Sequence, residues 1–424
     1  MSAADVHRAI ETVFRMESPR LIAGLARIVR DVGVAEQLAQ DALVAALEQW
    51  PGDGIPNNAG AWLMGAAKHR AIDHLRRERV RARKEEELGH AFEADRGRAA
   101  VDAETAIDED VGDDLLRLVF VSCHTLLSRE ARVALTLRLL GGLSTDEIAR
   151  AFLVPEPTIA QRIVRAKRTL AEARVPFEVP RGQERAARLS SVLEVVYLVF
   201  NEGYSATAGE DWVRPALCED ALRLGRVLAE LTPEEPEVHG LVALMEIQAS
   251  RTRARVGASG EPVLLFDQNR ALWDRVLIGR GLAALARAEK LDGGRGPYAL
   301  QAAIAACHAR ARTPEETDWR RIVSLYDALA RTAPSPVVDL NRAVAVSMAD
   351  GPEAALAIVD ALASEPALTG YHWLPSVRGD LLARMGRLAE AREELERAAS
   401  LTHNARERRL LLERAAELLQ RGSG

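Results

Sequence analysis

The chain has 424 residues, of which 48% are hydrophobic, 28% charged and only 4% aromatic. This composition excludes a disordered chain and predicts about two to four packed domains. The net charge of −6 argues against a protein that is basic throughout. Three widely spaced cysteines predict neither a disulfide framework nor a metal site. The absence of a signal peptide or a long apolar run predicts a cytoplasmic protein without membrane contact.

The first domain is predicted to span residues 1–84. Ala, Leu, Arg and Glu dominate the whole chain and β-branched runs are scarce, which predicts an all-α fold. Apolar residues recur at helical spacing across 22–29 and 35–47, with Gly33 between these two helices. The Pro, Gly and Asn content of Pro51–Asn58 predicts a loop, and a third helix is predicted to begin near Ala59.

Two consecutive segments then carry opposite net charges. Lys68–Lys84 carries a net charge of +6, and Glu85–Asp114 a net charge of −10. Residues 85–112 hold few large apolar side chains and are predicted to be a flexible acidic linker. The basic block favours phosphate contacts, and Trp62 with its polar neighbours favours stacking with unpaired bases. An ordinary solvated helix face with Trp62 in the core is the alternative interpretation.

A compact helical unit containing a helix-turn-helix is predicted over residues 113–175. Ser144 and Glu147 form a capping-box pattern for its first helix, which ends at Phe152. Val154–Pro157 is the predicted turn, with Pro157 suited to the first turn of the next helix. That helix, residues 158–170, has a predicted buried stripe of Ile159, Ile163, Ala166 and Leu170. Its predicted DNA-contacting residues are Thr158, Gln161, Arg162, Arg165, Lys167 and Arg168. A helical hairpin with basic solvent faces is the alternative.

These two segments, in this order, resemble regions 2 and 4 of the extracytoplasmic-function (ECF) sigma factors of the sigma-70 family. The first resemblance is carried by AEQLAQDALVAALEQW (35–50), by AWL (61–63) and by the spacing of Lys68, Ala71, Asp73, Arg76 and Arg77. The second is carried by SREARVALTLRLLGGLSTDEIA (128–149) and TIAQRIVRAKRTL (158–170). Together they cover residues 1–175.

The resemblance implies a transcription initiation factor whose partners are core RNA polymerase and promoter DNA. It implies polymerase contacts at Glu36, Gln37, Gln40 and Asp41. It implies contacts with the −10 promoter element at Asn57, Asn58, Trp62, Lys68, His69, Arg70, Asp73, Arg76 and Arg77. The second helix of the helix-turn-helix would read the −35 element. His69 stands where many family members carry Asn, which affects base preference.

Residues 183–424 are predicted to form a helical-repeat domain. Residues 339–362 and 376–401 each read as helix, Gly turn and helix, and both resemble tetratricopeptide repeats. A more divergent pair is predicted within 217–255. The stretches VYLVFNEGYSAT (196–207), FDQNRALWD (266–274) and LDGGRGPYALQAAIAACH (291–308), in this order, resemble an ECF subgroup with a tetratricopeptide-like extension. The resemblance implies that the extension replaces or supplements a separate anti-sigma factor. We expect regulation through contact with the two sigma domains or through a protein or small-molecule partner.

Polar and aromatic groups are predicted to gather in three loops of this extension. The clusters are Asn201, Glu202 and Tyr204; Asp267, Gln268, Arg270, Trp273 and Asp274; and Asp292, Gly293, Gly294, Arg295 and Tyr298. They indicate either a ligand or docking site, or simple turn formation with Trp273 in the core.

No catalytic residue, cofactor or metal site is predicted, and we do not expect an enzyme. The sequence holds no Gly-rich phosphate loop, no HExxH and no cluster of Cys and His ligands. Two other functions remain open: a polymerase-independent helix-turn-helix regulator with a C-terminal ligand- or protein-sensing domain, and a tetratricopeptide scaffold. The polymerase-docking pattern at 35–50 favours the sigma factor.

Overall fold

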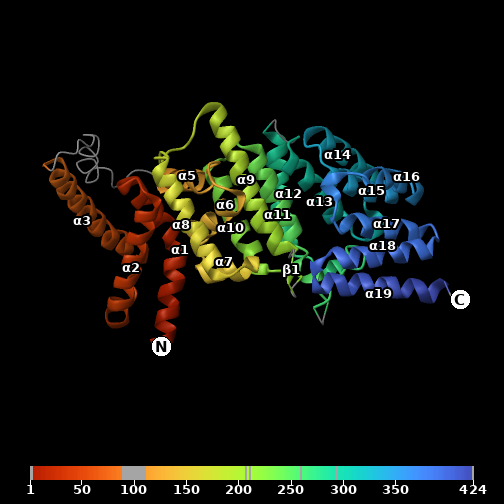
Figure 1. Cartoon of the computed structure of the whole chain (residues 1–424), viewed down its shortest axis with the longest axis horizontal. Helices are drawn as coiled ribbons and strands as arrows, with labels where there is room; N and C mark the ends of the chain where they lie inside the picture. Colours follow the sequence, from red (N-terminus) through yellow and green to blue (C-terminus); the bar gives the residue numbers. More distant parts are fainter. Residues whose placement is uncertain are drawn as a thin grey trace. The chain divides into compact units, whose positions relative to one another are not determined.

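The computed structural model describes residues 3–87, 111–205, 208–209, 212–257, 260–291 and 295–422. These residues are almost wholly helical (Figure 1), which confirms the predicted all-α fold. Two two-residue strands, β1 (Ala208–Gly209) and β2 (His403–Asn404), pair in parallel. Contacts divide the chain into one unit over Met1–Val196 and a second over Tyr197–Gly424.

The first unit begins with α1 (Ala3–Val29), α2 (Val32–Asp53) and α3 (Ala59–Glu87), and α1 packs against both others. The predicted break between the first two helices is present, but it lies at Arg30 and Asp31 and not at Gly33. Asp31 caps α2, because its side chain accepts hydrogen bonds from the backbone N–H groups of Gly33 (2.7 Å) and Val34 (3.0 Å). The predicted loop at 51–58 is too long, because α2 continues past the buried Trp50 and Pro51 and ends at Asp53.

The helix-turn-helix lies in the second half of this unit. This half contains α5 (Val111–Ser122), α6 (Arg129–Leu139), α7 (Thr145–Phe152) and α8 (Glu156–Glu172), and α7 and α8 form the helix-turn-helix. The capping box of Ser144 and Glu147 is confirmed, as is the buried stripe of α8. The turn is shorter than predicted: Leu153 adopts a left-handed conformation (φ 51°), and α8 begins at Glu156 with Pro157 in its first turn. Residues 88–110 of the predicted linker lie outside the described part of the chain.

Helix α9 (Gly182–Tyr204) contributes to both units. Its first part packs on α5 and α6: Arg188 donates to the carbonyl of Phe120 (3.1 Å), and the Ser191 hydroxyl donates to the carbonyl of Cys123 (2.8 Å). Arg132 on α6 forms an ion pair with Glu194 (3.3 Å). From Tyr197 onward the helix belongs to the second unit.

The second unit is a series of helices in which each contacts the next. They are α10 (Pro215–Leu231), α11 (Pro236–Ala249), α12 (Arg275–Lys290), α13 (Pro297–Arg310), α14 (Trp319–Thr332), α15 (Pro336–Ala349), α16 (Pro352–Leu362), α17 (Trp373–Arg384), α18 (Leu388–Leu401) and α19 (Ala405–Gly422). Short 3-10 turns lie at Thr252–Ala254, Arg270–Leu272, Pro314–Glu316 and Pro366–Leu368. Gly351 and Gly386 have positive φ and turn the chain between α15 and α16 and between α17 and α18, where the sequence predicted turns.

Gly240 allows a close approach between α11 and the start of α13. A Cβ atom there would lie 2.6 Å from the backbone nitrogen of Ala299. We expect Gly240→Ala to lower the free energy of unfolding by about 1–3 kcal/mol, because the backbone of α13 would have to move. Gly279→Ala on α12 is the control: no atom lies within 4 Å of its Cβ position, and alanine should stabilise that helix by up to about 1 kcal/mol. Urea denaturation distinguishes the two, and equal stability of both variants would contradict the expectation.

Among the described residues, no helix combines the length and apolarity needed to cross a membrane.

Candidate nucleic-acid and polymerase interfaces

The recognition helix α8 presents most of its predicted DNA-contacting residues on one face. Thr158, Gln161, Arg162, Arg165 and Arg168 lie on one side of the helix, from Arg162 at the edge of the buried stripe to Arg168 opposite it. Gln161, Arg165 and Arg168 are exposed, and Thr158 and Arg162 are half-buried. Arg168 is held on the helix surface by an ion pair with Glu172 (2.6 Å). This face can approach a DNA groove while the stripe anchors the helix.

Helix α3 displays the predicted −10 residues from its capped start onward. The Asn58 side chain accepts a hydrogen bond from the backbone N–H of Ala61 (3.0 Å) and so begins the helix. Trp62 is half-buried and meets the buried Trp50 edge to face, with ring centroids 5.2 Å apart. The exposed members of the set are Asn57, Asn58, His69, Asp73, Arg76 and Arg77, and the half-buried members are Trp62, Lys68 and Arg70. The structure therefore leaves a polar, mainly basic face on α3 while Trp62 also serves the domain's packing.

The predicted polymerase-binding residues on α2 differ in exposure. Gln37 is exposed, and Gln40 and Asp41 are half-buried. Glu36 is only 5% exposed. Its carboxylate accepts a hydrogen bond from the Arg138 Nε on α6 (2.6 Å) and forms a second ion pair with Lys167 on α8. Glu36 therefore contacts the helix-turn-helix in this structure.

Two further ion pairs join the α1–α2 region to the α5–α8 region. Arg27 on α1 lies 3.0 Å from Asp114 on α5, and Arg15 on α1 lies 3.4 Å from Glu147, the capping residue of α7. Burial raises the pKa of Asp114, and the positive charges of Arg27 and Arg117 act against that rise. We call the set Glu36–Arg138–Lys167, Arg27–Asp114 and Arg15–Glu147 the inter-region contact.

The inter-region contact brings together residues that the sequence assigned to different partners. Glu36 was a predicted polymerase contact, and Lys167 a predicted DNA contact. Lys167 lies beside the buried stripe rather than on the face of Arg162 and Arg165, since it is two positions from Arg165 on a 3.6-residue helix. Arg138 was not among the predicted site residues. It is 102 positions from Glu36, and no local pattern indicates the pairing.

The three polar clusters predicted for loops of the extension lie in different parts of the structure. Asn201, Glu202 and Tyr204 form the last turn of α9, so their placement in a loop is wrong. Trp273 is 3% exposed and belongs to the core, and Asp274 caps α12. Residues 292–294 lie outside the described part of the chain.

The helical fold and its helix-turn-helix define the class of DNA-binding proteins. Residues 13–81 match the Sigma-70 region 2 family, and residues 117–170 match the Sigma-70 region 4 family. An ECF RNA polymerase sigma factor, SigK of Mycobacterium bovis (strain BCG / Pasteur 1173P2), is 30% identical over 151 residues, which cover 34% of this chain and 74% of that protein. The probable ECF RNA polymerase sigma factor SigI of Mycobacterium tuberculosis is 27% identical over 179 residues, or 42% of this chain and 60% of that protein.

The chain belongs to the ECF RNA polymerase sigma factor family. Members of this family are transcription initiation factors rather than enzymes, and membership implies core RNA polymerase and promoter DNA as partners.

The extension has its own relationships. Residues 188–289 match a family of unknown function, DUF6596. An uncharacterized protein of Rhizobium meliloti (strain 1021) is 46% identical over 390 residues, which cover 92% of this chain and 91% of that protein. The combination of sigma regions and extension therefore also occurs along nearly the full length of a relative.

Proposed function

We propose that this sigma factor docks on core RNA polymerase through α2, contacts the −10 promoter element through α3 and reads the −35 element through α8. The observation that carries the proposal is the order of the two sigma regions together with the one-sided basic face of α8. Base-reading residues sit on the first turns of a recognition helix, and later basic residues hold the phosphates. Arg162 and Arg165 are the proposed principal −35 contacts.

The inter-region contact is the proposed resting arrangement of the free protein. The Glu36 carboxylate cannot pair with Arg138 and Lys167 and at the same time contact polymerase, and the same holds for the Lys167 ammonium and DNA phosphate. A protein whose binding-competent state is a minor population binds with reduced apparent affinity. Opening of the inter-region contact is therefore proposed to accompany promoter recognition.

The second unit is proposed to be a tetratricopeptide-like regulatory domain that takes a protein or small-molecule partner. Support comes from the helix pairs α15–α16 and α17–α18 with their positive-φ glycine turns, and from the nearest-neighbour packing along the unit. Helix α9 offers a physical link, since its first part packs on α5 and α6 and its last turns belong to the second unit.

Run-off transcription with purified core RNA polymerase tests the sigma function. The template is a genomic fragment library, and the protein is the full chain, because a truncation before α9 would remove the Arg188 and Ser191 contacts with α5 and α6. Discrete start sites that appear only with this protein are the expected result. Sequence-specific binding to duplex DNA without any polymerase-dependent start site would overturn the proposal and favour a polymerase-independent regulator.

A further inference from the structure

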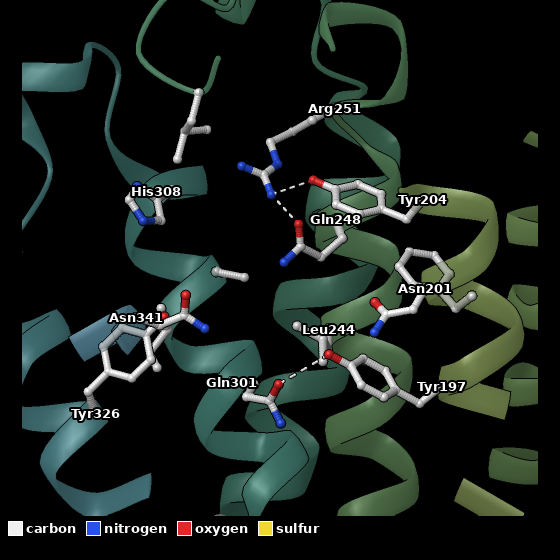
Figure 2. A pocket seen from close by; sticks show the side chains of 14 residues that line it. Tyr197, Asn201, Tyr204, Leu244, Gln248, Arg251, Gln301, His308, Tyr326 and Asn341 are labelled. Carbon is white, nitrogen blue, oxygen red and sulfur yellow. Dashed lines mark hydrogen bonds between the residues drawn. The ribbon is translucent and has the colours of Figure 1, made fainter. Parts of the chain in front are cut away.

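The second unit contains a cavity of about 300 Å³ with an amphipathic lining (Figure 2). Its walls come from α9, α11, α13, α14 and α15, with Leu265 from the loop between α11 and α12. Phe200, Leu244 and Ile304 supply apolar surface, and Tyr197, Tyr204 and Tyr326 supply rings with polar ends. This volume is at the lower end of the range for small-molecule sites, which are mostly apolar with a few placed polar groups.

Arg251, just after the end of α11, is the one charged side chain in the lining if His308 is neutral; the lining contains no Asp or Glu. The Arg251 Nη2 donates to the Tyr204 hydroxyl (2.7 Å) and also to the Gln248 side chain. The Arg251 Nε is shielded from solvent and has no hydrogen-bond partner among the described residues. In Figure 2 the Arg251 guanidinium lies between Tyr204 and His308, across the upper part of the cavity. A guanidinium fixed by neutral partners keeps its full positive charge toward the cavity.

The surroundings of Arg251 add positive charge. The Arg255 guanidinium carbon lies 3.6 Å from the Tyr204 ring centroid, and those of Arg251 and Arg270 lie 5.7 Å and 4.8 Å from the Trp273 ring. Burial lowers the pKa of Arg251, Tyr204 acts against that decrease, and the nearby Arg255 adds to it.

Burial, together with the charges of Arg251 and Arg270, also lowers the pKa of His308 to about 4, so His308 is neutral near pH 7. Arg251 is half-buried, and a partly desolvated positive charge without a counter-charge is costly; an anion would relieve that cost.

We propose that this cavity binds a small organic carboxylate, with its carboxylate on Arg251 and its apolar or aromatic body against the tyrosines and aliphatic side chains. Planar bidentate pairing with a carboxylate is one of the strong, charge-assisted interactions that a guanidinium forms. The apolar part of the lining, formed by Phe200, Leu244 and Ile304, disfavours a fully hydrated inorganic anion. The proposal that this ligand is the regulatory signal rests on the proposed function. The proposal that the cavity binds a carboxylate does not depend on it.

Binding to the cavity would act directly on α9. Tyr197, Asn201 and Tyr204 line the cavity from the last two turns of this helix. Arg188 and Ser191 of the same helix hold the carbonyls of Phe120 and Cys123. A carboxylate bound to Arg251 would change the hydrogen bond between Arg251 and the Tyr204 hydroxyl. It would therefore act on the last turn of α9, the helix whose first part packs on α5 and α6.

The test is isothermal titration calorimetry on the full chain, without polymerase, using sodium benzoate and its neutral counterpart benzamide. Benzoate is expected to bind at least about tenfold more tightly than benzamide, since a hydrogen bond to a charged group is worth that factor or more. Inorganic phosphate is expected to bind more weakly than benzoate. The pH titration of the His308 Cε1 resonance, assigned by its loss in His308→Gln, should move to higher pH with benzoate, because an anion beside Arg251 raises the pKa of that ring.

Arg251→Gln is expected to weaken benzoate binding about tenfold or more, and the matched control Arg253→Gln, an exposed arginine two residues away, should leave it unchanged. Equal affinity for benzoate and benzamide, no binding of benzoate at 10 mM (about the weak limit for so small a ligand), or an unchanged affinity in Arg251→Gln would each overturn the proposal. The comparison of benzoate with benzamide uses the unmodified chain, so a folding defect in a variant does not affect it. Because no transcription is measured, failure here leaves the sigma function untouched.

Discussion

Replacing Arg162 and Arg165 together by alanine is expected to reduce promoter-directed transcription roughly 100-fold or more. Each side chain that reads a base edge contributes about 1–3 kcal/mol of discrimination, and both lie on the same side of α8, outside its buried stripe. The buried anchors of the helix remain, so the fold should persist. Run-off transcription from a promoter mapped with the unmodified protein provides the measurement.

The matched control removes two exposed arginines from α12, Arg275 and Arg280, and changes the net charge by the same amount. This control variant should leave start-site selection unchanged, because α12 is not a proposed DNA contact. A loss of transcription in the control would show that overall charge, and not the recognition helix, causes the effect. Binding of core polymerase by the Arg162/Arg165 variant should also be retained. If this variant initiated from the same promoters with undiminished yield, α8 would not be the −35 reader.

Arg138→Met is expected to shift the free protein toward an open arrangement of its two sigma regions by about tenfold. The substitution removes the 2.6 Å charge-assisted hydrogen bond to the Glu36 carboxylate, which is worth about 1.5–3 kcal/mol, while Lys167 still pairs with Glu36 and limits the effect. Arg138 is not a proposed DNA or polymerase contact, so apparent affinity for core polymerase should rise by a similar factor.

Energy transfer between dyes on two exposed positions, Glu48→Cys on α2 and Ala171→Cys on α8, measures this opening. Arg150→Met is the control, since Arg150 forms an ion pair within α7, with Asp146 at 2.8 Å. The control should leave both energy transfer and polymerase affinity unchanged. A closed signal in Arg138→Met together with unaltered polymerase binding would show that the inter-region contact does not restrain the sigma regions.

Features that depend on neighbouring residues were predictable. The capping box of Ser144 and Glu147 and the stripe from Ile159 to Leu170 follow from helix geometry alone, and the structure has both. Gly351 and Gly386 mark turns because they tolerate positive φ. Two helix boundaries were misplaced because other residues determine them. The Asp31 side chain caps α2, so Gly33 lies inside the helix, and α2 extends past the buried Trp50 to include Pro51.

The helical content, the helix-turn-helix and the buried stripe of its second helix could be predicted from the sequence, because they depend on contacts within a few residues. The packing of distant helices alone decided that Glu36 is buried against Arg138 and Lys167, which lie more than a hundred positions away along the chain. It also decided that Arg251 faces a cavity built by helices from α9 to α15. A pairing between distant helices depends on how those helices pack, and helical periodicity specifies which face is buried but not which partner covers it.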